Sequence, residues 1–228
     1  VRAIRRSTWR GLVLDDIDGP PTDPERAAEV HAQAAADDLE ANHGFDRRDV
    51  RSWWARLRSL AAWRPELGLP VFDHEEITAM LPVLCQGKTS IAELRKLPIV
   101  SILSGFLSAE QTAALEREAP ERLRVPSGSR VRLDYEPGKP PVLAVRLQEL
   151  FGMTETPTVA GGRVRVMVHL LAPNGRPQQI TDDLASIWAT TYSQVRAELR
   201  GRYPKHHWPE DPLTTTPTAR TRPRRKRR

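Results

Sequence analysis

The chain has 228 residues, of which 39% are hydrophobic and 28% charged, a balance typical of a globular protein. Its formal net charge is +6, but residues 220–228 hold seven of the 35 basic residues and no acidic one, so the remainder has 28 basic residues against 29 acidic ones. The lone Cys85 excludes an internal disulfide and a cysteine-based zinc site. No apolar run is long enough to span a membrane, so we expect a cytoplasmic protein without membrane contact.

The first 120 residues have mainly helical patterns. Residues 1–17 are the exception, because their alternating apolar and polar residues predict one or two strands. The chain opens with Val1 rather than Met, which suggests that it is part of a longer polypeptide. Helices are predicted over 23–42, 46–63 and about 74–84, followed by two or three short helices within 90–119. The helix start signals are an Asp-Pro pair at the first helix and two capping boxes, Ser90 with Glu93 and Ser108 with Gln111.

The pattern changes at residue 121. Three strands separated by Pro/Gly turns are predicted, then a short helix at 148–152 and a β-hairpin that turns at Asn174-Gly175. A final amphipathic helix is predicted over 184–203, with one face formed by Leu184, Ile187, Trp188, Thr191, Tyr192, Val195 and Leu199. The sequence therefore predicts an α+β fold with a helical subdomain at 19–120, a mixed β-sheet and hairpin domain with its C-terminal helix at 121–212, and a disordered basic tail at 213–228.

Motifs for catalysis and metal binding are weak. The stretch LCQGKTS, residues 84–90, resembles a phosphate loop, but Pro82 stands where that loop needs a glycine. His206 and His207 are adjacent on an extended stretch and would point in opposite directions, which does not suit a shared metal ion. His169, within the apolar strand VMVHLL, is predicted to be a hydrogen-bonded sheet residue. We therefore predict no catalytic residue and no metal site.

Arginines on the predicted strands are more informative. Arg130 and Arg132 alternate with apolar residues, so both lie on one face of their strand, and Arg163 and Arg165 repeat this pattern. If these faces converge, the four guanidinium groups could follow the phosphates of a nucleic acid. The alternative is an ordinary solvated sheet face on which the arginines pair with neighbouring acidic residues.

The segment LRGRYPKHHWPEDP, residues 199–212, allows two interpretations. In the first, Arg200, Arg202 and Lys205 contact phosphates while Tyr203 or Trp208 stacks on a base. In the second, the two aromatic rings are buried and fasten an extended run of chain to the domain. Beyond this segment, a basic cluster would bind any polyanion without sequence preference; it contains Arg224, Arg225, Lys226 and Arg227.

Four long segments carry a resemblance to a known family. Residues 125–135, 140–157, 161–188 and 192–212, which include VPSGSRVRLDY and GGRVRVMVHLLAPNGRPQQITDDLASIW, resemble the C-terminal domain of bacterial HrpB-type ATP-dependent RNA helicases, which are DEAH-box-like superfamily 2 proteins. The helical stretch before them, with WWARLRSL, looks like the region that precedes this domain. The opening WRGLVLDD looks like the end of an OB-like accessory portion, at 1–18.

The resemblance implies a parent polypeptide with two RecA-like motor domains that bind ATP and magnesium. This chain has no Walker A motif, DEAH-type box or arginine finger, so it is expected to hold no cofactor and to be non-catalytic alone. The resemblance implies an accessory region that docks on the motor and accessory domains and helps to hold single-stranded RNA or DNA. The alternative is a protein–protein interaction module that contacts nucleic acid only through its basic tail.

Overall fold

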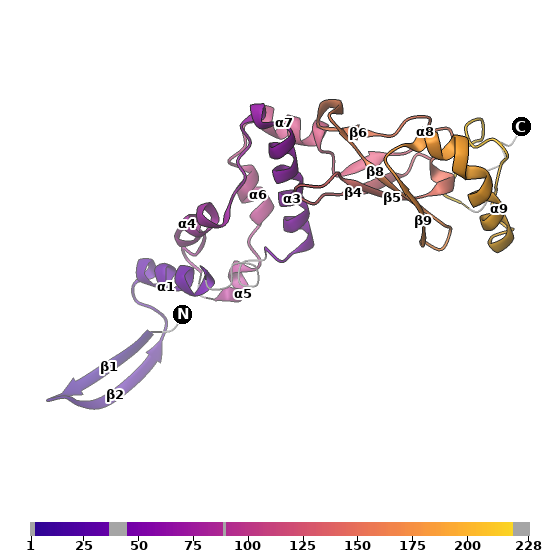
Figure 1. Ribbon diagram of the computed structural model, residues 1–228. Coiled ribbons are helices and arrows are strands. Elements are labelled where there is room, and N and C mark those ends of the chain that lie inside the picture. Colours follow the sequence, from indigo (N-terminus) through magenta and orange to yellow (C-terminus); the bar gives the residue numbers. More distant parts are fainter. Residues whose placement is uncertain (1–2, 37–44, 89, 221–228) are drawn as a thin grey trace, which may run out of the picture. The chain divides into compact units, whose positions relative to one another are not determined.

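The computed structural model describes residues 3–36, 45–88 and 90–220 (Figure 1). Its contacts group the chain into two compact units. Unit 1 comprises Val1–Arg51 and Val71–Phe106, and unit 2 comprises Ser52–Pro70 and Leu107–Arg228. The helical region expected at 19–120 is thus shared between both units. None of the helices in the described ranges is long and apolar enough to cross a membrane.

Unit 1 begins with an antiparallel hairpin, β1 (Ala3–Trp9) and β2 (Leu12–Gly19). The two turn residues, Arg10 and Gly11, both have positive φ angles (47° and 85°), as the tightest hairpin turns require. Its large apolar side chains are between 52% and 66% exposed, and they are Ile4, Trp9, Leu12, Val13, Leu14 and Ile17. The strands predicted at 1–17 are therefore present, without a hydrophobic core of their own.

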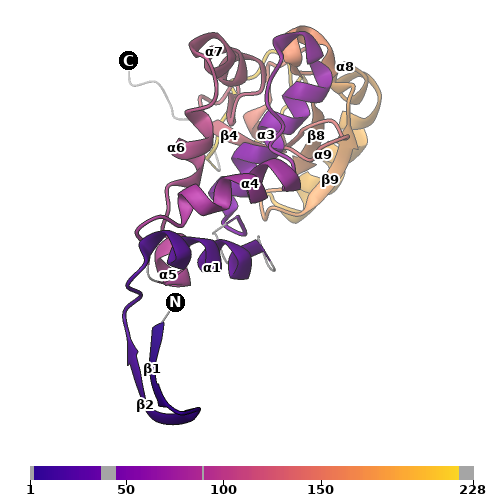
Figure 2. The same cartoon turned by 90° about the vertical axis from the view of Figure 1, so that its left-hand side faces the viewer.

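The rest of unit 1 is helical. Its helices are α1 (Pro24–Ala36), the first turn of α3 (Arg48–Trp63), α4 (His74–Leu84), α5 (Ile91–Leu94) and α6 (Ile99–Ser104). Asp73 caps α4 by a reciprocal pair of hydrogen bonds with Glu76. Helices α1 and α4 contact each other (Figure 2). The helix predicted at 23–42 is confirmed as far as Ala36, and its remainder lies outside the described residues.

In unit 2, the remainder of α3 is linked to α7 (Ala109–Glu118) by charged side chains. Arg56 on α3 donates to the carbonyl of Ala119 (Nε to O, 2.8 Å) and to the carboxylate of Glu116 (Nη2 to Oε1, 2.9 Å). Arg64 pairs with the buried carboxylate of Glu118. The capping box predicted at the start of α7 is present, because Ser108 and Gln111 exchange hydrogen bonds.

A five-stranded mixed sheet follows, in the order β3-β4-β5-β8-β9. Its strands are β3 (Arg122–Arg124), β4 (Arg130–Asp134), β5 (Val142–Arg146), β8 (Met167–Leu171) and β9 (Pro177–Thr181). Only the β5–β8 pair is parallel. Between β5 and β8, the chain forms a separate small sheet from β6 (Thr158–Val159) and β7 (Val164–Arg165). The turn predicted at Asn174-Gly175 connects β8 to β9, with Gly175 at a φ of 83°.

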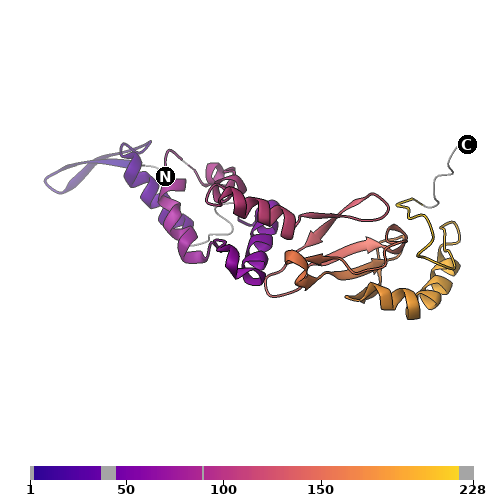
Figure 3. The ribbon, with the colours of Figure 1, turned by 90° about the horizontal axis from the view of Figure 1, so that it is seen from above.

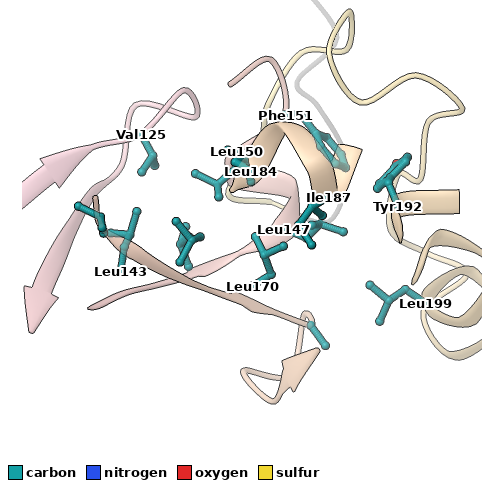
Figure 4. Packing of buried hydrophobic residues seen from close by; sticks show 14 of the residues in the cluster. Val125, Leu143, Leu147, Leu150, Phe151, Leu170, Leu184, Ile187, Tyr192 and Leu199 are labelled. Atoms are coloured by element: carbon teal, nitrogen blue, oxygen red, sulfur yellow. The ribbon is translucent and has the colours of Figure 1, made fainter. Parts of the chain in front are cut away.

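The core of unit 2 lies on one face of this sheet (Figure 4). Leu143 and Leu170, from neighbouring strands, are at most 1% exposed, and the final helix contributes Leu184, Ile187 and Leu199 to the same cluster. That helix, on one side of the sheet, is drawn in orange in Figure 3. It is divided into α8 (Leu184–Ser186), a π-helical turn at Ile187–Thr191 and α9 (Tyr192–Arg202), rather than being the uniform α-helix expected. Its predicted apolar face is confirmed.

The expected disorder does not begin at residue 213. Thr218 is 7% exposed, and its backbone N–H donates to the carbonyl of Gln148 (3.0 Å). Asp211 holds the start of the segment by accepting from the N–H of Leu213 and the hydroxyl of Thr214. Residues 213–220 therefore follow a defined course, because side-chain hydroxyls and turn contacts compensate for the lack of an apolar pattern.

Candidate nucleic-acid interface

Four arginines face one another across the β3–β4 hairpin. Arg122 pairs in register with Arg132, and Arg124 with Arg130. Cross-strand partners lie on the same face of a sheet, so all four side chains share one face, which we call the arginine face. Arg122, Arg124 and Arg130 are exposed, and Arg132 is half-buried. The prediction that Arg130 and Arg132 share a face is confirmed, and the structure adds Arg122 and Arg124 to them.

The arginine face has little internal charge compensation. Arg132 lies 3.6 Å from Asp134 (Nε to Oδ1), but none of the ion pairs found among the described residues involves Arg122, Arg124 or Arg130. Arg122 donates a hydrogen bond from Nη1 to the carbonyl of Arg130 (3.3 Å). Like charges directly opposite on two strands are destabilising. Two such pairs side by side form a surface on which a bound anion would relieve the repulsion.

The arginine face extends to the next strand. Arg146 is exposed at the end of β5, and it lies on the side of that strand opposite to the buried Leu143 and Val145. The pKa of His206 is lowered mainly by burial of the imidazole and, to a smaller extent, by the positive charge of Arg146. Sequence reasoning missed Arg122, Arg124 and Arg146. The sequence does contain a signal for Arg122 and Arg124: RLR (122–124) and RVR (130–132) have the same alternation on either side of the Pro-Ser-Gly-Ser turn, as two strands of one hairpin would.

Arg163 and Arg165 do not join this surface. Arg163 lies outside the strand expected for it, at the end of a short 3-10 turn, Ala160–Gly162. It donates to the carbonyl of Trp63 (3.3 Å) and pairs with Glu66 (Nη2 to Oε1, 2.6 Å). Arg165 is exposed on β7, which belongs to the small separate sheet. Arg163 and Arg165 do alternate with the half-buried Val164 and the buried Val166, as predicted, but β7 is not a strand of the five-stranded sheet, so their face does not continue that of Arg130 and Arg132.

Glu66 forms the ion pair with Arg163, and its lowered pKa makes the stability of unit 2 depend on pH. A hydrogen bond from its own backbone N–H, followed by those from Arg64 and Arg163, lowers the pKa of Glu66 from 4.5 to about 2. The stabilisation that this carboxylate provides is therefore present above pH 4.5 and is lost as the pH falls towards 2. We expect Glu66→Gln to flatten the fall in thermal unfolding midpoint over this range. Glu110→Gln, at an exposed carboxylate on α7, is the matched control, and an equal effect of both would contradict the expectation.

The segment at 199–212 is fastened to the domain. Trp208 is 7% exposed and donates from Nε1 to the carbonyl of Tyr203 (3.0 Å). Further hydrogen bonds hold the carbonyls of residues 207–209, with Gln148 donating to His207, Arg196 to Trp208 and Tyr192 to Pro209. Tyr203 is half-buried against the same core. Trp208 therefore packs inside the domain and does not offer a ring face for stacking on a base.

The other basic candidates are dispersed. Arg202 pairs with Glu198 one helical turn away (2.9 Å), whereas Arg200 and Lys205 are exposed. The tail candidates Arg224, Arg225, Lys226 and Arg227 lie outside the described residues. Across the described ranges, no group of three or more histidine, cysteine, aspartate or glutamate side chains is placed to hold a metal ion. The arginine face is thus the densest group of predicted and newly found candidates.

Comparisons with known proteins agree with this architecture. Residues 80–212 match a family model described as HrpB_C, ATP-dependent helicase C-terminal. The ATP-dependent RNA helicase HrpB of Escherichia coli K12 is 43% identical over 185 residues, which cover 76% of this chain and 23% of that protein. A crystal structure of the E. coli DExH-box NTPase HrpB matches with a TM-score of 0.79 and 33% identity, covering 96% of this chain and 29% of that one.

A second crystal structure, of the E. coli DEAH/RHA helicase HrpB, matches with a TM-score of 0.66 and 31% identity, covering 91% of this chain and 28% of that one. The chain therefore spans about a quarter of the length of the relatives that it matches. The family match includes the whole five-stranded sheet and the final helix. The chain belongs to the HrpB_C family, whose description is ATP-dependent helicase C-terminal.

Proposed function

We propose that this chain is a non-motor accessory region of an ATP-dependent RNA helicase, which docks on the motor core and helps to hold single-stranded RNA or DNA. The observation that carries the nucleic-acid role is the arginine face, with its two directly opposed arginine pairs. In this proposal, ATP and magnesium are bound by motor domains outside this chain, and the protein acts in the cytoplasm. The arginine face supplies contacts to phosphate rather than to particular bases.

For phosphate binding, the charge of the arginine face matters more than the net charge of residues 1–219, which is close to zero. Opposed residues on antiparallel strands have Cα atoms about 4.5–5.5 Å apart, and the screening length at physiological ionic strength is about 8 Å. The arginines of the face therefore act on a phosphate together, whereas the acidic residues elsewhere on the body are largely screened. Arginine also suits this role because its planar guanidinium can donate two parallel hydrogen bonds to one phosphate.

The protein-interaction alternative is supported by a different observation, the β1–β2 hairpin. Its exposed apolar side chains include the cross-strand pair Trp9 and Leu12. An exposed apolar strand pair is marginal in water and is usually covered by another surface. This observation favours docking on a protein surface, and it is compatible with the arginine face holding nucleic acid at the same time.

The decisive experiment separates the arginine face from the basic tail. A chain that lacks residues 221–228 is expected to retain binding to a labelled oligouridylate, measured by fluorescence anisotropy at several salt concentrations. Changing Arg122, Arg124 and Arg130 to alanine in that chain should weaken binding about 100-fold, at about 1 kcal/mol for each exposed arginine–phosphate contact removed. The slope of log affinity against log salt should also become shallower by roughly one for each phosphate that is no longer bound.

The control is an equal change of charge on a solvated helix face. Arg48, Arg51 and Arg58 are exposed along α3, and their replacement by alanine is expected to change affinity and salt slope much less. If binding disappears when residues 221–228 are removed, the arginine face does not hold nucleic acid and the protein-interaction function stands in its place. The same conclusion follows if both triple variants bind equally well.

A further inference from the structure

The sheet of unit 2 has a second face that the core leaves uncovered. Its centre is a row of three residues in register across neighbouring strands, with Ala144 on β5 opposite His169 on β8, and His169 opposite Ile180 on β9. Ala144 and Ile180 are exposed, and His169 is half-buried. None of the three belongs to the buried cluster formed with the final helix. We call this row the outer row.

Strand β9 turns its only large aliphatic side chain towards this face. Ile180 is 55% exposed, whereas its neighbour Gln179 is the residue paired with the buried Leu170. Burial of the isoleucine against the core would gain free energy in proportion to the apolar area removed from water. A single exposed aliphatic residue is common, but here the half-buried Met167 and Leu171 flank His169 on the same side of β8. The outer row is thus part of a continuous, largely apolar strip.

The arginine face lies on the same side of the sheet as the outer row. Arg132 precedes the buried Leu133 on β4, and Ala144 follows the buried Leu143, which is the register partner of Leu133. Neighbouring strands are about 4.8 Å apart, so β4 and β8, with β5 between them, are separated by about 10 Å. The arginine face and the outer row, which contains His169, are therefore close enough for one or two nucleotides to contact both.

We propose that the outer row binds the unstacked bases of the single strand whose phosphates contact the arginine face. The proposal rests on the proposed function and adds the substrate feature that this site recognises. A base has an apolar ring face that packs on His169 and Ile180, while its phosphate remains near the guanidinium groups. A duplex hides those ring faces in its stack and presents only phosphates to the arginines. The sheet therefore discriminates single strands from duplexes.

The test compares one labelled oligouridylate as a single strand and as a duplex with its complement, using the chain without residues 221–228. His169→Ala together with Ile180→Thr should weaken single-strand binding roughly tenfold and leave duplex binding and the salt slope unchanged, because every arginine that meets a phosphate is still present. His169→Phe should retain single-strand binding, since it keeps a ring face. Val83→Thr, at a 68% exposed valine on α4, is the matched control and should change neither affinity.

Ile180→Thr alone provides a variant that keeps the fold, because its side chain is already largely exposed. If the outer-row variants bind the single strand as the unchanged chain does, or lose single strand and duplex equally, the base-binding role is overturned. If they instead lose only the binding of a purified helicase portion added in trans, the outer row is a protein-docking surface and the proposal is also overturned. The proposed function would survive either result, because it fails only when the arginine variants bind normally or the tail accounts for all binding.

Discussion

Replacing Trp208 by alanine is expected to lower the free energy of unfolding of unit 2 by about 3–5 kcal/mol, the usual cost of removing a large buried aromatic side chain. Trp208 is 7% exposed within the core, and its Nε1–H hydrogen bond to the carbonyl of Tyr203 is removed as well. The indole group of Trp208 is the part of the extended run at 204–212 that enters the core, so its removal leaves a cavity and releases that run. Chemical denaturation, followed by circular dichroism, measures the change.

Arg200→Ala is the control for this prediction. Arg200 is exposed on the last turns of α9, in the same basic segment, and its removal is expected to change stability by less than about 0.5 kcal/mol. If Trp208→Ala proved as stable as Arg200→Ala but bound the oligouridylate more weakly, Trp208 would be a contact residue rather than a fastening. Under the proposed function, folded Trp208→Ala at low temperature retains the salt slope of the unchanged chain, because the arginine face is intact.

Local patterns in the sequence predicted most of the elements. The helix predicted at 74–84 and the turn at Asn174-Gly175 appear where apolar spacing and turn chemistry placed them. These features depend on residues within a few positions of one another. The disorder expected from residue 213 was wrong up to residue 220, because Thr218 is held by the distant carbonyl of Gln148.

The composition of the candidate site depends on long-range pairing, which was harder to predict. Arg163 followed the same alternation as Arg130, yet its partner Glu66 lies nearly a hundred residues earlier in the chain. Strand alternation alone cannot distinguish an arginine that is occupied by such a partner from one that faces solvent. Conversely, Arg122 and Arg124 became candidates only when the register of β3 against β4 placed them opposite Arg132 and Arg130.

The second large effect on stability is expected at Arg56, which positions the start of the β3–β4 hairpin that carries the arginine face. Its side chain is 5% exposed, and its Nε–H donates a hydrogen bond to the carbonyl of the fully buried Ala119. The next residue, Pro120, accepts a hydrogen bond from the hydroxyl of Tyr135 (2.9 Å), which follows β4. Arg56 therefore fixes the chain immediately before β3 begins, at the point where the hairpin is closed by Tyr135.

Arg56→Ala is expected to destabilise unit 2 by about 2–4 kcal/mol. The carbonyl of Ala119, left without its donor, costs about 1–3 kcal/mol, and the packing of the arginine stem is removed as well. The cost should stay below that of a fully buried ion pair, because the other partner, Glu116, is 63% exposed and becomes solvated. Denaturant unfolding gives the size of the effect, and amide hydrogen exchange in α7 and β3 locates it.

Arg56→Met separates the two contributions, because it keeps most of the stem and removes the donors; it should recover part of the missing stability. Arg58→Ala, at an exposed arginine on the same helix, should cost less than about 1 kcal/mol. If exchange accelerates in β3 as well as in α7, the arginine face depends on the α3–α7 contact for its geometry. Equal stability of Arg56→Ala and Arg58→Ala would show that this contact contributes nothing, and that the β3–β4 hairpin is held by the sheet alone.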